Sequence, residues 1–344
     1  MWWDKNKKDE TLAILKEKLG EVLCDVPLNR ISYLKIGGNA QYYFEAKNKD
    51  DLIKAVKLAR ELSLAHLIIG SSSNLLFLDG GFTGLIIKNN YTAKDAITIN
   101  GMEVIAPSGI SLLVLIKELA QRGLGGIEFL APIPGTLGGA VVNSVEAHKK
   151  EIKDYLAGIN ILDFDGEVKF IEAEKLGLKY RNSKLKGLAK KRNYLKYPVI
   201  LEAKLKLMPR TKEEVERLVQ SVFLMRSKSQ PKGLSLGCTF RNPKMTQQCH
   251  PEAEPRGSGP LDQYNFPQNV INGNRVSVGY LLDQLQLKGK RIGKMQISKE
   301  HANFFINLGG AKASHYLNLI EEAKGKVKEK YNLNLKEEIE VVEN

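Results

Sequence analysis

The chain has 344 residues, of which 43% are apolar and 26% are charged, proportions typical of globular proteins rather than of disordered or membrane proteins. Its length predicts two or three domains at about 150 residues each, and no apolar run approaches the ~18 residues that a membrane-spanning helix needs. The formal net charge of +13 predicts an anionic partner, unless the excess lysines only form a solvated surface.

The first third of the chain alternates strands with helices. Leucines at helical spacing predict an amphipathic helix over residues 9 to 23. A second helix is expected over residues 50 to 64, because its apolar side chains recur at three- and four-residue intervals. Strands are expected at residues 41 to 46, 67 to 69 and 85 to 87. Residues 29 to 89 are therefore predicted to form an αβ unit.

From residue 97 to residue 208 the pattern changes to short strands with one helix. The helix is predicted over residues 111 to 122 and ends at Gly123. The dipeptide Asp165-Gly166 is typical of a hairpin turn. Strands are expected at residues 104 to 106, 159 to 163, 168 to 171 and 199 to 207.

Helices return in the last part of the chain. A charged helix is predicted from Thr211 to about Ser227, and two more are expected over residues 278 to 286 and 313 to 330. Residues 244 to 275 contain many prolines and glycines and little periodic hydrophobicity. This composition predicts a long surface loop or a partly disordered segment.

Two glycine-containing segments are candidates for holding a phosphorylated ligand. The strand at residues 67 to 69 runs into the small residues 70 to 74, whose successive backbone N–H groups can form an anion-binding concavity. An ordinary polar turn is the alternative. Residues 132 to 140 interleave glycines with apolar residues, which lets the backbone lie flat against a flavin or a nucleotide. Here the alternative is a tight packing corner.

Two motifs, one with a cysteine and one with a glutamate, contain candidate catalytic residues. A lone cysteine is more often a small buried apolar residue than a reactive group, but Cys238 lies between a glycine and polar residues, which suits a proton donor. Glu338 lies in the segment 335 to 341, which alternates like a strand, and a solvated acidic edge is the default interpretation. His301 is expected to be structural.

The cysteines and the charges indicate a compartment and a kind of partner. Cys24, Cys238 and Cys249 are odd in number and widely spaced, so neither a disulfide framework nor a C-x-x-C zinc site is expected. The N-terminus has no apolar signal-peptide region, and we expect a cytoplasmic protein without a metal ion. Part of the basic excess lies between Lys179 and Lys196 and would suit a nucleotide-sugar diphosphate, a phosphorylated cofactor or nucleic acid.

Taken in chain order, these motifs resemble the UDP-N-acetylenolpyruvoylglucosamine reductase (MurB) family. The resemblance covers residues 25 to 342. It is carried by IGG at residues 36 to 38, the loop from Gly70 to Leu76, GIE, PIPGTLGGA, YRNS, GCTFRNP, SVGYLLDQLQLKGKRIG, SKEHANFFIN and LKEEIEVV.

The resemblance implies an α+β fold. Its parts would be a two-part FAD-binding domain of the vanillyl-alcohol-oxidase/PCMH type and a C-terminal αβ substrate domain. The expected division is an N-terminal helix at residues 1–24, FAD-binding parts at residues 25–90 and 91–211, and a substrate-binding domain at residues 212–344 with an inserted loop at residues 244–275.

The resemblance also implies a reaction. NADPH reduces FAD, and reduced FAD then converts UDP-N-acetylglucosamine-enolpyruvate to UDP-N-acetylmuramate in peptidoglycan precursor synthesis. By motif position, Arg181 and Glu338 stabilise the enolate, and Cys238 replaces the serine that usually donates the proton. Arg226 and Asn242 are expected to contact the UDP-sugar. The expected FAD contacts are Gly70, Ser71, Ser72, Ser73, Asn74, Gly135, Thr136, Gly138, Gly139 and Ala140.

Three features depart from the family pattern. Ser71 and Ser72 stand where glycines are usual, residues 144 to 148 replace a glycine-containing turn, and the segment 244 to 275 is much longer than in relatives. Two other functions stay open: another FAD-dependent oxidoreductase of the same superfamily, and a diverged non-catalytic relative or basic nucleic-acid-binding protein. For the reductase function that the resemblance implies, we expect no nucleic acid, no membrane insertion and no obligatory protein partner.

Overall fold

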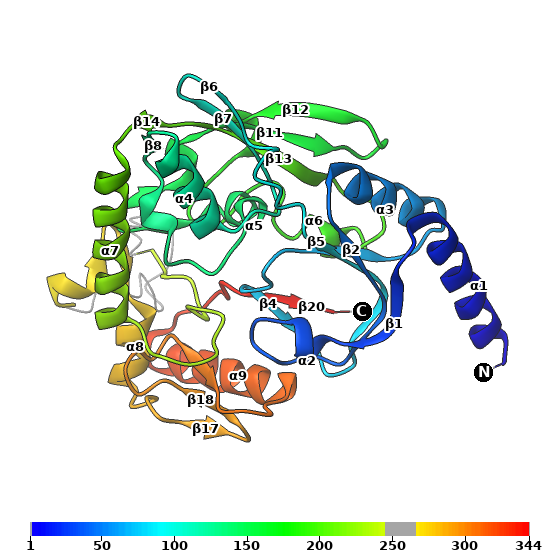
Figure 1. Ribbon diagram of the computed structural model, residues 1–344. Helices are drawn as coiled ribbons and strands as arrows, with labels where there is room; N and C mark the ends of the chain where they lie inside the picture. The colour runs from blue at the N-terminus through cyan, green and yellow to red at the C-terminus, as the bar shows by residue number, and fades with distance from the viewer. Residues whose placement is uncertain (1, 245–265, 344) are drawn as a thin grey trace, which may run out of the picture.

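The computed structural model describes residues 2–244 and 266–343. Its helices and strands surround three hydrophobic cores, and Figure 1 shows the parts of the chain that enclose them. Within the described residues, no helix is both long enough and apolar enough to cross a membrane.

The first core lies around a four-stranded sheet with the order β1-β2-β5-β3. β1 is antiparallel to β2, whereas β2, β5 and β3 run parallel. α3 buries Leu52, Ala55 and Val56, as its periodicity predicts, and Asn48 caps it by accepting the Asp51 N–H at 2.8 Å. The elements are α1 (Trp2–Leu19), β1 (Val22–Pro27), α2 (Leu28–Ile31), β2 (Asn39–Ala46), α3 (Lys49–Glu61), β3 (His66–Ile69), β4 (Leu75–Phe77) and β5 (Phe82–Asn89).

The first helix ends earlier than predicted. α1 ends at Leu19, Gly20 adopts a left-handed conformation with φ +85°, and β1 begins at Val22. The prediction of a helix through Leu23 is wrong because β1 pairs with β2, a long-range contact that the spacing of leucines does not encode. Leu23 accordingly lies on the outer strand, with 55% of its surface exposed.

The second core lies against a five-stranded antiparallel sheet with the order β12-β11-β13-β7-β6. The predicted turn at Asp165-Gly166 joins β11 to β12, and α7 adds Val215 and Val222 to this core. The elements are β6 (Thr98–Asn100), β7 (Glu103–Pro107), α4 (Leu112–Gln121), β8 (Leu124–Gly125), η1 (Glu128–Leu130), α5 (Leu137–Val142), β9 (Glu146–Ala147), β10 (Lys150–Glu151), η2 (Ile152–Asp154), β11 (Leu156–Leu162), β12 (Val168–Glu172), η3 (Ala173–Leu176), α6 (Leu188–Lys191), β13 (Val199–Lys206), β14 (Met208–Pro209) and α7 (Lys212–Ser229).

The third core lies between a small antiparallel sheet and two helices. The sheet has the order β17-β18-β19, and α9 packs on β17, β18 and α8. The elements are η4 (Gln268–Val270), β15 (Ile271–Asn272), β16 (Arg275–Val276), α8 (Val278–Gln284), β17 (Arg291–Ile292), β18 (Met295–Ile297), β19 (Phe305–Asn307), α9 (Ala313–Tyr331) and β20 (Glu340–Val342).

The end of the chain returns from the third core to the first. β20 lies parallel to β4, and Figure 1 shows this red strand beside the blue one. The strand predicted over residues 335 to 341 is reduced to Glu340–Val342. Glu338 precedes the strand, and its N–H donates to the Thr239 carbonyl at 2.8 Å. This return places Glu338 between the cores rather than on an exposed edge.

The predicted long loop is only partly within the described chain. Residues 245–265 of that loop lie outside the described residues. The last ten residues form η4 and the antiparallel pair of β15 and β16. Lys244 forms an isolated bridge with Arg275, so the described ends of the segment lie side by side.

Candidate functional site

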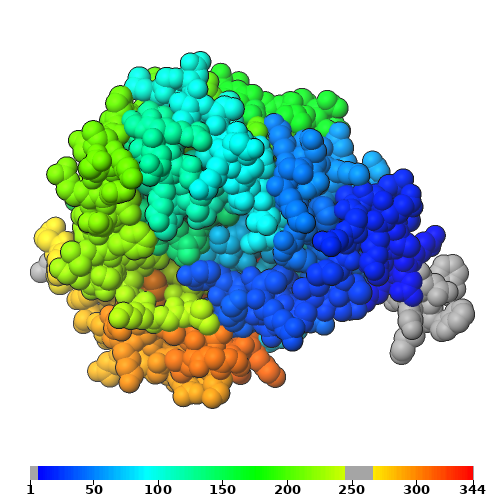
Figure 2. Space-filling view, viewed as in Figure 1, coloured from blue at the N-terminus to red at the C-terminus, as the bar shows by residue number. Residues whose placement is uncertain are grey.

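A cavity of about 680 Å³ is lined by residues from the parts around all three cores. Figure 2 shows these parts packed together, with the orange C-terminal part below the blue and green ones. Both glycine-containing segments line the cavity, as do the motifs around Arg181, Cys238 and Glu338. All ten residues predicted to contact FAD line it.

The first of the two glycine-containing segments, residues 70 to 74, forms the loop between β3 and β4, and we refer to the two as the candidate cofactor segments. Ser72 adopts a left-handed conformation with φ +51°, and the Leu75 N–H closes the turn on the Ser72 carbonyl at 3.2 Å. Within the described chain, the N–H groups of Ser72 and Ser73 have no hydrogen-bond acceptor. Free backbone donors at a cavity wall suit an anionic group such as a pyrophosphate.

The second segment lies against the first with little spare room. A Cβ atom on Gly70 would come within 2.5 Å of the Thr136 Oγ1 atom, so this position requires glycine. Thr136 caps α5 by accepting the Gly139 N–H at 3.3 Å. A Cβ atom on Gly138 would lie 2.9 Å from the Ser108 Cβ atom. Backbone therefore forms both walls, and the donor set and the volume fit a dinucleotide cofactor.

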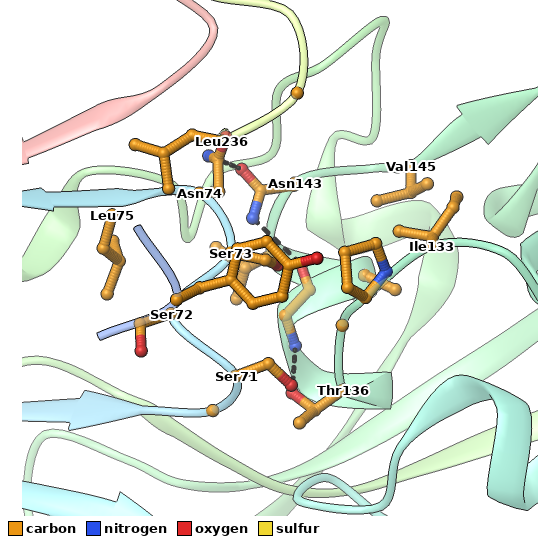
Figure 3. Close-up of a pocket in the computed structure, with 18 of the residues that line it drawn as sticks. Ser71, Ser72, Ser73, Asn74, Leu75, Ile133, Thr136, Asn143, Val145 and Leu236 are labelled. Carbon is orange, nitrogen blue, oxygen red and sulfur yellow. Dashed lines mark hydrogen bonds between the residues drawn. The ribbon is translucent and has the colours of Figure 1, made fainter. Parts of the chain in front are cut away.

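Asn143 joins the two segments and was not among the predicted site residues. Its Oδ1 atom accepts from Asn74 Nδ2 at 3.1 Å, and its Nδ2 atom donates to the Gly139 carbonyl at 3.0 Å. Figure 3 shows these two asparagines facing each other, with the bonds dashed. The signal in the sequence was an amide residue at the C-terminal end of the helix that contains Gly138 and Gly139.

Arg181 and Glu338 form the charged centre of the cavity. Arg181 Nε lies 3.0 Å from Glu338 Oε1, and the two side chains are 23% and 14% exposed. This contact is an ion pair without an aligned hydrogen bond, because the buried Nε atom has no hydrogen-bond partner. Arg181 adopts a left-handed conformation with φ +52° between the paired residues Lys179 and Asn182. Glu338 is thus buried and paired, and the default interpretation of a solvated edge is wrong.

Two opposing effects act on the Glu338 carboxyl. Burial raises its pKa, and the positive charges of Arg181, Lys186 and Arg241 oppose that rise. The pKa remains above its ordinary value. A carboxyl with a raised pKa is easier to protonate and can then donate a hydrogen bond to an anionic ligand.

Cys238 lies beside this pair on the cavity wall. It forms an isolated bridge with Phe304 and is partly exposed. Burial raises the pKa of its thiol to about 12, the Glu338 charge adds to the rise, and Arg181 opposes it. The sulfur therefore carries its proton at neutral pH, which suits a proton donor and not a thiolate nucleophile.

The two predicted substrate contacts separate in the structure. Arg226, in the last turn of α7, lines the cavity. Burial lowers the pKa of its guanidinium, and the nearby Tyr33 and Cys238 partly oppose this shift. Asn242 does not line the cavity, because its Oδ1 atom accepts the Val278 N–H at 3.0 Å. Tyr33 was not predicted and lines the cavity near Arg226.

Two family models match the chain. The FAD binding domain matches residues 40–171, and the C-terminal domain of UDP-N-acetylenolpyruvoylglucosamine reductase matches residues 230–342. The fold and the cavity therefore define a flavoprotein in which an FAD-binding domain precedes a C-terminal αβ domain. The predicted α+β fold class and the FAD cofactor are confirmed.

Relatives match over nearly the whole chain. The UDP-N-acetylenolpyruvoylglucosamine reductase of Bacillus subtilis is 32% identical over 97% of this chain and 98% of its own length, and that of Rubrobacter xylanophilus is 33% identical over 92% and 94%. The crystal structure of the Thermus caldophilus reductase matches with a TM-score of 0.69 and 29% identity, over 94% of this chain and 98% of that one. The chain belongs to the UDP-N-acetylenolpyruvoylglucosamine reductase family.

Proposed function

We propose that this protein reduces the enol ether of UDP-N-acetylglucosamine-enolpyruvate to give UDP-N-acetylmuramate, a step of peptidoglycan precursor synthesis, with NADPH as the reductant. One observation carries this assignment. Arg181, Cys238 and Glu338 come from three separate segments and meet in the cavity that both glycine-containing segments line. When bound, FAD supplies the hydride that reaches the enolpyruvyl double bond.

Arg181 and Glu338 stabilise the charge that develops on the substrate. Addition of a hydride to the terminal vinyl carbon leaves negative charge on the neighbouring carbon and its carboxylate. The Arg181 guanidinium supplies a fixed positive charge there, and the paired Glu338 carboxyl can supply a hydrogen bond when protonated. Both groups are largely buried, so they act in a medium where such stabilisation is stronger than in water.

Cys238 completes the reaction by giving its proton to the carbon that carries the negative charge. The high pKa of the thiol keeps the proton on Sγ until that charge has developed. Its bridge with Phe304 holds the residue on the cavity wall beside the charged pair.

The remaining site residues bind the two ligands. We assign the cofactor contacts to Gly70, Ser71, Ser72, Ser73, Asn74, Gly135, Thr136, Gly138, Gly139 and Ala140, which line the cavity. Arg226 would pair with the diphosphate of the UDP-sugar, because its positively charged guanidinium lines the cavity and arginine binds phosphate well. Asn242 would support the substrate site only through its bond to the start of α8.

The cellular setting is part of the same proposal. We expect the protein to act in the cytoplasm, without nucleic acid, membrane insertion or an obligatory protein partner.

The domain division also remains a proposal: residues 1–24, 25–90, 91–211 and 212–344, with the insertion at 244–275. Within it, α7 shares its core with the second FAD-binding part.

Two measurements test the proposed function. The purified protein should show a flavin absorption band once FAD is added, and it should then consume NADPH continuously only when the UDP-enolpyruvyl sugar is present. Sustained NADPH consumption with oxygen alone would indicate an oxidase. Protein that stays colourless with excess FAD would exclude every flavin-dependent function.

A further inference from the structure

Lys186 is a partly buried lysine that no motif assigns. It follows the segment 180 to 183 by three residues, and its N–H donates to Ser183 at 3.2 Å. The Ser183 Oγ atom donates in turn to the Val142 carbonyl at 2.6 Å, at the end of α5. The backbone of Lys186 is therefore anchored to the helix that carries the second cofactor segment.

The ammonium group of Lys186 points to the main chain of the reaction centre. Its Nζ atom donates to the Glu338 carbonyl at 3.2 Å, and Asn74 Nδ2 donates to the same oxygen at 3.3 Å. In the part of the chain that the structure describes, no carboxylate oxygen lies within 4.0 Å of this ammonium. The Glu338 main chain is thus held by two donors from different elements, one of which belongs to the first cofactor segment.

The pKa of the Lys186 ammonium depends on its burial and on the charges around it. Burial lowers the pKa of the ammonium to about 8, the charge of Arg241 lowers it further, and Glu338 and Glu340 oppose this. Arg181 adds a smaller repulsion. The charged groups that face Glu338 are Arg181, Lys186, Arg241 and Glu146. Lys186 is the one cation among them that can lose its charge near neutral pH.

We propose that Lys186 is a positioning residue for the reduction of the enol ether: its ammonium fixes the main chain of Glu338, so that the carboxyl stays in register with Arg181 and Cys238. Lys186 does not line the cavity, so it acts through Glu338 and not on the substrate. This role presupposes the proposed function, and it goes beyond it by adding a residue that touches neither ligand.

Separate half-reactions test this role. In stopped-flow measurements, Lys186→Met should slow reoxidation of the reduced flavin by the UDP-enolpyruvyl sugar by about tenfold, and reduction of the flavin by NADPH should stay within about twofold. Lys186→Arg should keep both rates, because it restores a donor and a charge. Lys184→Met is the matched control, since Lys184 is an exposed lysine two residues away, and both of its rates should match those of the wild type.

The pH profile separates positioning from general support of the fold. In the wild type, the reoxidation rate should fall as pH rises through about 8, because the ammonium then becomes a neutral amine. Lys186→Arg should lack this decline. Equal slowing of both half-reactions in Lys186→Met, or the same alkaline decline in wild type and Lys186→Arg, would overturn the role of Lys186. A wild-type protein whose reduced flavin ignores the UDP-sugar would instead overturn the proposed function.

Discussion

Cys238 combines a protonated sulfur with a place beside a charged pair. Its thiol has a pKa of about 12, so nearly every molecule carries the proton at neutral pH. Arg181 and Glu338 lie close enough to this sulfur to shift its pKa. A donor that is protonated in the resting site, yet close to a developing negative charge, is what protonation of a carbanion requires.

Replacement of Cys238 by alanine should affect one half-reaction. We expect Cys238→Ala to slow reduction of the enol ether by about 10² to 10⁴-fold, since a positioned proton donor contributes that much, and to leave flavin reduction by NADPH unchanged. Cys238→Ser should keep most of the rate, because a hydroxyl also donates a proton. Stopped-flow absorbance of the flavin measures both steps, and a parallel loss in both would contradict the role of the thiol.

His66 makes the fold sensitive to acid. Its ring is buried at the start of β3, stacks on Tyr197 with ring centroids 5.0 Å apart, and leaves Nε2 without a partner. Burial lowers its pKa to about 4, against the bond to the Leu64 carbonyl. The folded state therefore disfavours the protonated ring, and the stability that the neutral ring allows is present above about pH 6.5 and is lost as pH falls toward 4.

Removing this titration should flatten the acid side of the stability curve. The depressed pKa corresponds to a loss of about 3 kcal/mol between pH 7 and pH 4. We expect His66→Leu to show a smaller loss over this interval, by about that amount, in urea unfolding followed by circular dichroism. If wild type and variant lose stability equally on acidification, other groups dominate.

The two cofactor segments work as a pair because their backbones touch. The contact of Gly70 with Thr136 sets their spacing, and Asn143 bonds to both Asn74 and the Gly139 carbonyl. Asn74 also donates to the Glu338 carbonyl. The proposed cofactor wall and the main chain of Glu338 are therefore connected through the side-chain amide of Asn74.

Loss of the Asn143 amide should weaken FAD binding. Asn143→Ala removes the hydrogen bond to Asn74 in the first segment and the bond to the Gly139 carbonyl in the second, and we expect the dissociation constant for FAD to rise by roughly tenfold, which corresponds to about 1.4 kcal/mol. Quenching of flavin fluorescence on binding measures this constant. Asn90→Ala, at an exposed asparagine, is the control and should bind FAD like the wild type. An unchanged constant in Asn143→Ala would mean that the segments keep their spacing without this bond.

The cavity brings together parts that have separate hydrophobic cores. Residues from around each core line it. The C-terminal strand β20 pairs with β4 beside the cavity, so the end of the chain is joined to the N-terminal part there. A ligand that fills this cavity would contact all three parts. Binding should therefore stabilise the molecule as a unit rather than one part alone.

FAD should accordingly protect the protein against heat and proteolysis. At free FAD about 100-fold above its dissociation constant, we expect about 2.7 kcal/mol of added stability, seen as a higher melting temperature in differential scanning calorimetry. Limited proteolysis should slow in the N-terminal and the C-terminal parts alike. Protection confined to the N-terminal part would mean that the C-terminal part does not depend on the cofactor site.

Local patterns were enough to predict much of this protein. The helices α3 and α4 and the strands β2, β3, β5, β7, β11, β12 and β13 follow from hydrophobic periodicity, because that pattern reflects which face of each element is buried, whereas the edge strands β1 and β6 were not predicted. The ordered motifs identified the family, and three residues that they singled out, Arg181, Cys238 and Glu338, line the cavity.

Long-range contacts decided the rest. The early end of α1, the burial of Glu338, the exclusion of Asn242 from the cavity and the bonds of Lys186 all depend on residues far away in the chain. The proposed ligand contacts lie in recognisable motifs, whereas a supporting hydrogen bond such as that of Lys186 can come from any polar side chain that lies close enough. Only the packing of the three cores shows which side chain does so.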